Sequence, residues 1–168
     1  PYIDAYDAMV FTMADYVAND LPPEKINLTT PAIDPLSPKN TYLSPGLCEK
    51  ILRFVGVDTS RPLVTQVSRF DPWKDPLGVI EAYRLVKKHI PGLQLAMLGH
   101  LAMDDPQGIQ MFEQTQAAAD NDPDIYMFTN FTAASSIEVN AFQRASDVVI
   151  QKSIREGFGL VVAEALWK

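Results

Sequence analysis

From residue 63 onward, short apolar segments alternate with longer amphipathic ones, and this alternation constrains the fold more than any other feature. The apolar segments 63–67, 93–98, 124–128 and 147–151 have the length and composition of buried strands. The segments 77–89, 107–119, 135–145 and 161 onward have helical character. Such alternation predicts an α/β, Rossmann-like fold, in which a parallel sheet carries helices on both faces.

The region before residue 63 is less regular. We expect strands over 7–13 and 26–29, and helices over 14–21 and 47–55. Pro22-Pro23 ends the first of these helices, and Gly56 ends the second with a left-handed cap. The proline-rich stretch 34–45 between them indicates an irregular linker.

The stretch from Glu156 to Glu164 has the strongest functional pattern. Gly157 and Gly159 allow a tight turn and a close backbone approach, and an apolar run with helical character follows. Glu164 lies roughly two turns along that helix, and the helix N-terminus can receive an anion. Two carboxylates around such a turn suit a ligand with hydroxyls at both ends and phosphate in the middle, as in a nucleotide sugar.

Two cations follow the first strand of the alternating region. Arg69 comes directly after the β-branched run, and a proline-containing loop then delivers Lys74. Parallel α/β sheets bind ligands at the carboxyl ends of their strands. The alternative is a solvated loop arginine and lysine, with a solvated Glu164 on the later helix.

Together with Thr30-Pro-Ala-Ile-Asp34, these elements resemble, in content and order, retaining glycosyltransferases of the two-domain GT-B fold. Ala32 stands where many members carry glycine. Further stretches, 33–37, 66–74, 138–147 and 153–160, are similar to the trehalose-forming synthases and the related trehalose phosphorylases. The resemblance implies transfer of glucose from a nucleoside-diphosphate glucose to glucose, giving α,α-trehalose with retention. Phosphorolysis and a non-catalytic nucleotide-binding fragment are the alternatives.

The resemblance also implies a domain division. Residues 1–34 would be the end of an N-terminal acceptor domain and the crossing between domains. Residues 35–168 would be most of a C-terminal nucleotide-sugar-binding domain, incomplete at its C-terminus. Since the active site of such enzymes lies between two domains, we expect this chain alone to be inactive, and a homodimer is compatible with the full-length protein.

Site residues are implied as follows. Arg69 and Lys74 hold the diphosphate, helped by backbone N–H groups at Gly159, Leu160 and Val161. Glu156, with Gly157 and Phe158, positions the glucose, and Glu164 binds the ribose. Glu156, Arg69 and Lys74 are the catalytic candidates, and no metal or prosthetic group is required. Asn130 either lines the base pocket or forms a turn, and His100 is more simply a loop residue than a donor contact.

Composition limits the other function classes. The net charge is −7, which argues against nonspecific nucleic-acid binding and makes local cations more informative. The single cysteine, Cys48, excludes an internal disulfide and is expected to be a small buried residue on a helix. No apolar run is long enough for a membrane span and no signal pattern opens the chain, so we expect a cytoplasmic protein.

Overall fold

A computed structural model describes residues 3–168 and divides the chain into two units, Pro1–Ile33 and Asp34–Lys168. In the first unit, β1 (Met9–Phe11) and β2 (Ile26–Leu28) form a parallel two-stranded sheet. Its 3-10 helices are Ile3–Ala5, Ala14–Tyr16 and Pro23–Lys25. Both expected strands are therefore present, in shortened form.

The helix predicted over 14–21 is wrong. Only Ala14–Tyr16 forms a 3-10 turn, and Val17 is already extended at φ −83° and ψ 120°. Asp15, Asn19 and Asp20 are residue types with low helix propensity, because their side chains can replace helical hydrogen bonds of the backbone. The segment is also shorter than the roughly 12–15 residues that an isolated helix needs in water.

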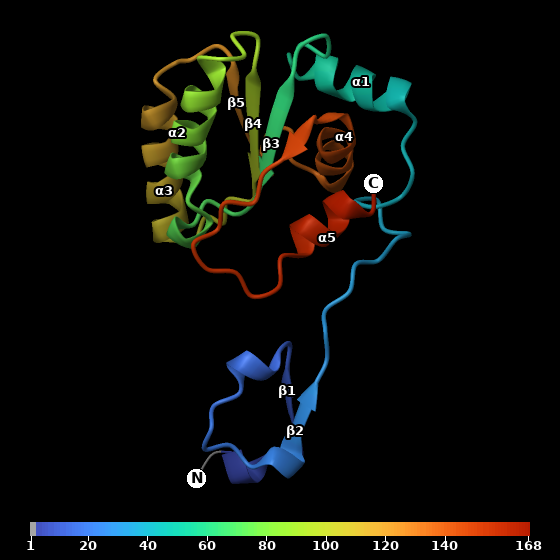
Figure 1. Cartoon of the computed structure of the whole chain (residues 1–168), viewed down its shortest axis with the longest axis vertical. Helices are drawn as coiled ribbons and strands as arrows, with labels where there is room; N and C mark the ends of the chain where they lie inside the picture. Colours follow the sequence, from blue (N-terminus) through green and yellow to red (C-terminus); the bar gives the residue numbers. More distant parts are fainter. Residues whose placement is uncertain (1–2) are drawn as a thin grey trace. The chain divides into compact units, whose positions relative to one another are not determined.

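The second unit is built on a four-stranded parallel sheet (Figure 1). Its strands are β3 (Leu63–Val67), β4 (Gln94–Gly99), β5 (Ile125–Thr129) and β6 (Val148–Val149). All four predicted strands are present. The last is shorter than the predicted 147–151, because only Val148 and Val149 pair with β3.

The strand order is β5-β4-β3-β6, which creates a switch point beside β3. The chain adds β4 and then β5 on one side of β3, and returns to the other side with β6. Strands that follow β3 in the chain therefore lie on both sides of it. In open α/β sheets a ligand crevice forms at this place.

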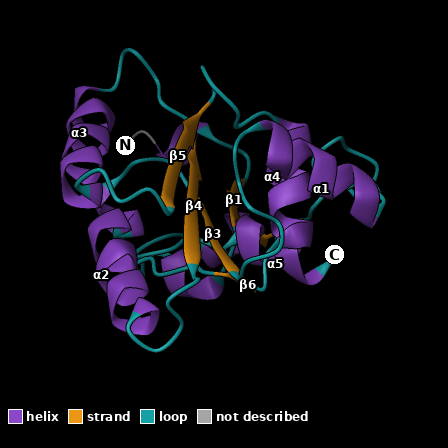
Figure 2. Cartoon of the chain, turned by 90° about the horizontal axis from the view of Figure 1, so that it is seen from above, coloured by secondary structure: helices purple, strands orange, loops and turns teal. Residues whose placement is uncertain are grey.

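Helices cover both faces of the sheet, as predicted (Figures 1 and 2). One face carries α2 (Pro76–Lys87) and α3 (Pro106–Ala119), and the other carries α1 (Pro45–Phe54) and α4 (Ser136–Ala145). The last helix, α5 (Leu160–Leu166), follows β6. None of the helices within residues 3–168 is long and apolar enough to cross a membrane.

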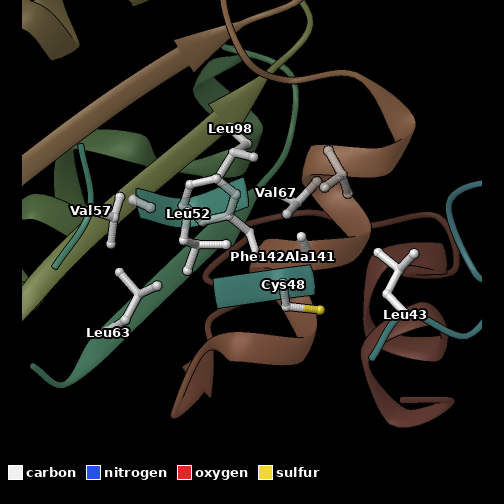
Figure 3. Close-up of a cluster of buried hydrophobic side chains, with 11 residues drawn as sticks. Leu43, Cys48, Leu52, Val57, Leu63, Val67, Leu98, Ala141 and Phe142 are labelled. Atoms are coloured by element: carbon white, nitrogen blue, oxygen red, sulfur yellow. The ribbon is translucent and has the colours of Figure 1, made fainter. Parts of the chain in front are cut away.

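The central strand β4 supplies side chains to two hydrophobic cores. Ala96 and Leu98 join the core under α1 and α4, in which Phe142 and the predicted buried Cys48 lie (Figure 3). Leu95 and Met97 join the core under α2 and α3. Successive side chains of a strand point to opposite faces, so a strand buried on both faces needs a continuous apolar run.

Candidate functional site

A cavity of 440 Å³ lies at the switch point of the second unit. Its walls come from the ends of β3 and β4, the start of α4, the loop between β6 and α5, and the segment before α1. The lining includes Arg69, Lys74, Glu156, Phe158, Gly159, Leu160 and Val161, together with Lys39, His100, Ser135, Ser136 and Gln151. Most of the residues predicted for the site thus share one cavity.

The loop after β3 holds Lys74 in place through its backbone. Asp71 caps a short 3-10 helix that ends at Lys74, because its carboxylate accepts a hydrogen bond from Trp73 N at 2.8 Å. The buried Gln66 side chain donates to the Lys74 carbonyl oxygen at 2.9 Å. Ile154 N donates to Trp73 O at 2.8 Å, which ties this loop to the loop after β6.

Glu156 is the centre of a hydrogen-bond network. Lys74 Nζ and Gln151 Nε2 each lie 2.6 Å from Glu156 Oε2, and Ser153 Oγ donates to the same oxygen at 3.2 Å. Gly157 N donates to Oε1 at 3.0 Å. Burial alone would raise the pKa of the Glu156 carboxyl, but the bonds from Lys74 and Gly157 outweigh it and lower that pKa. The site therefore holds a fixed carboxylate at neutral pH.

Arg69 lies at the rim of the cavity. Its side chain is 64% exposed, against 19% for Lys74, and its Nη2 lies 3.0 Å from Asp71 Oδ2. A guanidinium carries five N–H donors, so the contact with Asp71 uses only part of its capacity. Arg69 and Lys74 are thus two cations from one loop, one exposed and one half-buried.

The turn into α5 depends on glycine at one position. Gly159 has φ +83°, a left-handed conformation that side-chain-bearing residues rarely adopt. It is followed by Leu160 and Val161, whose first-turn N–H groups have no acceptor within the helix. Gly157 is not among the cavity-lining residues, and its N–H donates to Glu156.

Glu164 is buried, with only 7% of its surface exposed. It does not line the cavity, but its neighbour Lys39 does, and Lys39 Nζ lies 3.1 Å from Glu164 Oε2. The direction of approach does not suit a hydrogen bond, so this enclosed oxygen has no hydrogen-bond donor among residues 3–168. The contact is an ion pair with an unfilled acceptor.

Of the two further candidates, His100 lines the cavity and Asn130 does not. Asn130 lies outside the cavity lining, and its Oδ1 accepts a hydrogen bond from Leu101 N at 2.7 Å. This bond joins the loop after β5 to the loop after β4, so it is a contact between two loops and not one within a turn. His100 is exposed, and although we expected a plain loop residue, it lines the cavity.

Lys39, Gln151 and Ser153 were missed by the sequence analysis. Gln151 and Ser153 follow β6 directly, so the rule that identified Arg69 and Lys74 after β3 could have found them. Lys39 stands in a proline-rich segment without periodicity, and no local pattern distinguishes it from a solvated lysine. Within the described residues, no group of three or more His, Cys, Asp or Glu side chains could hold a metal ion.

Comparison with known proteins identifies the family. Residues 49–167 match the model of the family described as Glycosyl transferases group 1, so the chain belongs to this family. The chain is 55% identical over 168 residues to a trehalose synthase of Rubrobacter xylanophilus, covering 100% of this chain and 40% of that protein. It is 30% identical over 181 residues to a trehalose phosphorylase of Pleurotus pulmonarius, covering 92% and 24%.

The fold agrees with solved structures. A sucrose-phosphate synthase from Thermosynechococcus elongatus matches with a TM-score of 0.69 at 18% identity, over 98% of this chain and 39% of that chain. At this identity the match supports the fold alone, which is the Rossmann-like arrangement of GT-B enzymes. The chain spans about 40% of the length of the synthase it resembles.

Proposed function

We propose that the chain is the donor-binding part of a retaining hexosyltransferase that moves glucose from a nucleoside-diphosphate glucose to glucose, forming α,α-trehalose. The observation that carries the proposal is the 2.6 Å contact between Lys74 and Glu156 in the switch-point cavity. It joins the loop after β3 to the segment that opens α5. The likeness to trehalose synthases along the whole chain supports the choice of sugars.

In this proposal Arg69 and Lys74 bind the donor diphosphate. Both are cations beside one cavity, in a chain whose net charge is −7. Lys74 can shift part of its bonding from Glu156 to phosphate oxygens, because an ammonium has three donors. As the nucleotide leaves, the same two charges stabilise the developing negative charge. First-turn N–H groups at Gly159, Leu160 and Val161 add to this anion site.

Glu156 positions the glucose, with Gly157 and Phe158 beside it. Its carboxylate is held in place by Lys74, Gln151, Ser153 and Gly157, and it can accept a sugar hydroxyl as Lys74 turns toward the phosphate. Glucose would then transfer by same-face displacement. The acceptor oxygen bonds to the anomeric carbon as the bond to the nucleotide breaks, and the leaving phosphate takes the acceptor's proton.

Glu164 binds the ribose. A buried carboxylate oxygen without a hydrogen-bond donor is costly, and two vicinal hydroxyls would supply donors. This oxygen favours a nucleotide donor over free phosphate, because phosphate has no need of a carboxylate partner. Phosphorolysis remains the second candidate, favoured by the likeness to trehalose phosphorylase, since Arg69 and Lys74 could also hold inorganic phosphate.

Calorimetry separates these functions. The 168-residue chain is titrated with ADP, UDP, GDP and inorganic phosphate. We expect a nucleoside diphosphate to bind, phosphate to bind much more weakly, and the chain alone to make no trehalose, because the acceptor must be held in the same cleft. Lys88→Met, at an exposed position on the C-terminal side of α2, is the matched control for Lys74→Met. Tight phosphate binding with no nucleotide binding would favour phosphorolysis.

A further inference from the structure

Lys39 is a cavity lysine that does not belong to the sheet loops. It stands in the segment between the first unit and α1, lines the cavity, and keeps 33% of its side chain exposed. Its ammonium lies 3.1 Å from Glu164 Oε2. The lysine therefore connects this segment to the one carboxylate of α5 that is buried.

Side chains of α4 hold the backbone on both sides of Lys39. Asn140, with 0% of its surface exposed, donates through Nδ2 to Pro38 O at 2.9 Å and to Thr41 O at 2.8 Å. Arg144 Nη2 donates to Asn40 O at 3.3 Å. The buried Asn140 and the partly buried Arg144 thus fix the residues on both sides of Lys39, so α4 sets its place at the cavity wall.

The buried Glu164 carboxylate needs a neighbouring positive charge. Its Oε2 is fully enclosed, and a carboxylate oxygen without a donor loses the hydrogen bonds that water would supply. Lys39 approaches this enclosed oxygen and offsets its charge. Lys39 is on the cavity wall and Glu164 is not, so the lysine fixes the orientation of a carboxylate that lies directly behind this wall.

We infer that Lys39 is a positioning residue of the nucleotide site, which holds Glu164 in the orientation that accepts the two ribose hydroxyls. This rests on the proposed function, because it presumes a ribose at Glu164. Lys39 then acts on the ribose diol alone, whereas Arg69 and Lys74 act on the diphosphate. Replacing Lys39 should therefore not change the affinity for a nucleotide that lacks the diol.

The test compares ribonucleotides with dideoxynucleotides. The wild-type chain is titrated calorimetrically with ADP, UDP and GDP, and the tightest of these is compared with its 2′,3′-dideoxy analogue. We expect the analogue to bind about 10–100-fold more weakly. Lys39→Met should weaken ribonucleotide binding about tenfold and hardly change dideoxynucleotide binding. Lys39→Arg should restore most of the loss, and Lys50→Met, an exposed lysine of α1, should change neither affinity.

Glu164→Gln completes a double-mutant cycle with Lys39→Met. If the lysine acts through the carboxylate, adding Lys39→Met to Glu164→Gln should not further reduce the preference for the ribonucleotide over the dideoxynucleotide. Equal losses for ribo- and dideoxynucleotide, no loss, or tighter ribonucleotide binding in Lys39→Met would overturn the inference. The proposed function itself fails on a different result, namely no binding of any nucleoside diphosphate by the wild-type chain. Thermal unfolding followed by circular dichroism checks that each variant is folded.

Discussion

The two ends of the parallel sheet each carry a lysine paired with carboxylates, but the surroundings differ. At the amino end, Lys87 Nζ lies 3.0 Å from Asp122 Oδ1 and 2.9 Å from Asp124 Oδ2. At the carboxyl end, Lys74 Nζ lies 2.6 Å from Glu156 Oε2. Similar residue types therefore meet at similar distances in both places.

The amino end is closed by contacts within the chain. Arg61 Nη2 lies 2.6 Å from Asp124 Oδ1, and Tyr83 OH donates to Asp122 Oδ2 at 3.3 Å. Burial would raise the pKa of both aspartates, but the bonds from the Asp124 backbone, Lys87 and Arg61 outweigh it and lower both values. This network joins the end of α2 to the start of β5.

The carboxyl end opens instead on the 440 Å³ cavity. Arg69 is largely exposed there, and Glu164 Oε2 has no hydrogen-bond donor in the part of the chain that the structure describes. Polar groups with spare capacity beside a cavity suit a ligand, whereas satisfied groups suit a structural role. A charged pair therefore has to be judged by its surroundings as well as its distance.

Breaking the amino-end network should give the largest change in stability. Asp124→Asn weakens contacts with both Lys87 and Arg61, whose side chains are 25% and 30% exposed. Because the group is only partly buried, we expect the free energy of unfolding to fall by about 2–3 kcal/mol, below the loss for a fully buried pair. Urea denaturation measures it. Nucleotide affinity should stay unchanged, and Glu81→Gln on the exposed side of α2 is the control.

Breaking the Lys74–Glu156 pair at the carboxyl end should lower nucleotide affinity and leave stability nearly unchanged. Lys74→Met removes a charged hydrogen bond to the diphosphate, so nucleotide affinity should fall roughly 10–100-fold, about 1.5–3 kcal/mol. Glu156 keeps its bonds from Gln151 and Gly157, so the free energy of unfolding should change by less than about 1 kcal/mol. In the full-length enzyme the transfer rate should fall more than the affinity. Arg69→Ala should also lower both the nucleotide affinity and the transfer rate. If Lys74→Met lowered the free energy of unfolding by several kcal/mol and left nucleotide affinity unchanged, the assignment of the two ends would be reversed.

The two carboxylates of the cavity region should separate binding from transfer. Glu164→Gln replaces one acceptor oxygen with a donor, so nucleotide affinity should fall by about 1–3 kcal/mol while phosphate binding stays constant. Glu156→Gln should bind free nucleotide almost normally and transfer sugar poorly. Calorimetry measures the nucleotide affinity of both variants, and a rate assay of the full-length enzyme with nucleotide sugar measures their transfer. Normal nucleotide binding by Glu164→Gln would favour the phosphorylase.

Acid should affect the amino end more visibly than the carboxyl end. The pKa values of Asp122, Asp124 and Glu156 lie below 3.8, 3.8 and 4.5, their ordinary values. Their contribution is complete above those ordinary values and is lost as the pH falls through the lowered ones. Urea denaturation between about pH 3 and pH 7 should show this loss, and Asp124→Asn should flatten the profile more than Glu156→Gln. Equal flattening would mean that the two pairs contribute equally to folding.

The parallel sheet could be predicted from the sequence because its cause is local. A strand buried on both faces is mostly apolar, and segments such as 63–67 and 93–98 show this without knowledge of their neighbours, although each also buries polar side chains, among them Gln66 and Gln94. The segment 14–21 was misjudged because its helical pattern is weak and none of its side chains is buried in the described structure, so little packing favours a helix over a turn. The meeting of Lys74 with Glu156 was predictable because parallel strands deliver their loops to one edge.

Only the tertiary structure showed that Lys87 belongs to a closed network, and only it located Lys39 at the cavity. Both are lysines near carboxylates, and nothing in their local sequence says which of the two lines a cavity. That depends on the strand order β5-β4-β3-β6, which opens a crevice at one end of the sheet. It also depends on contacts such as Asn140 with Pro38, which are 102 residues apart. Such contacts form between surfaces that exist only after the chain has folded.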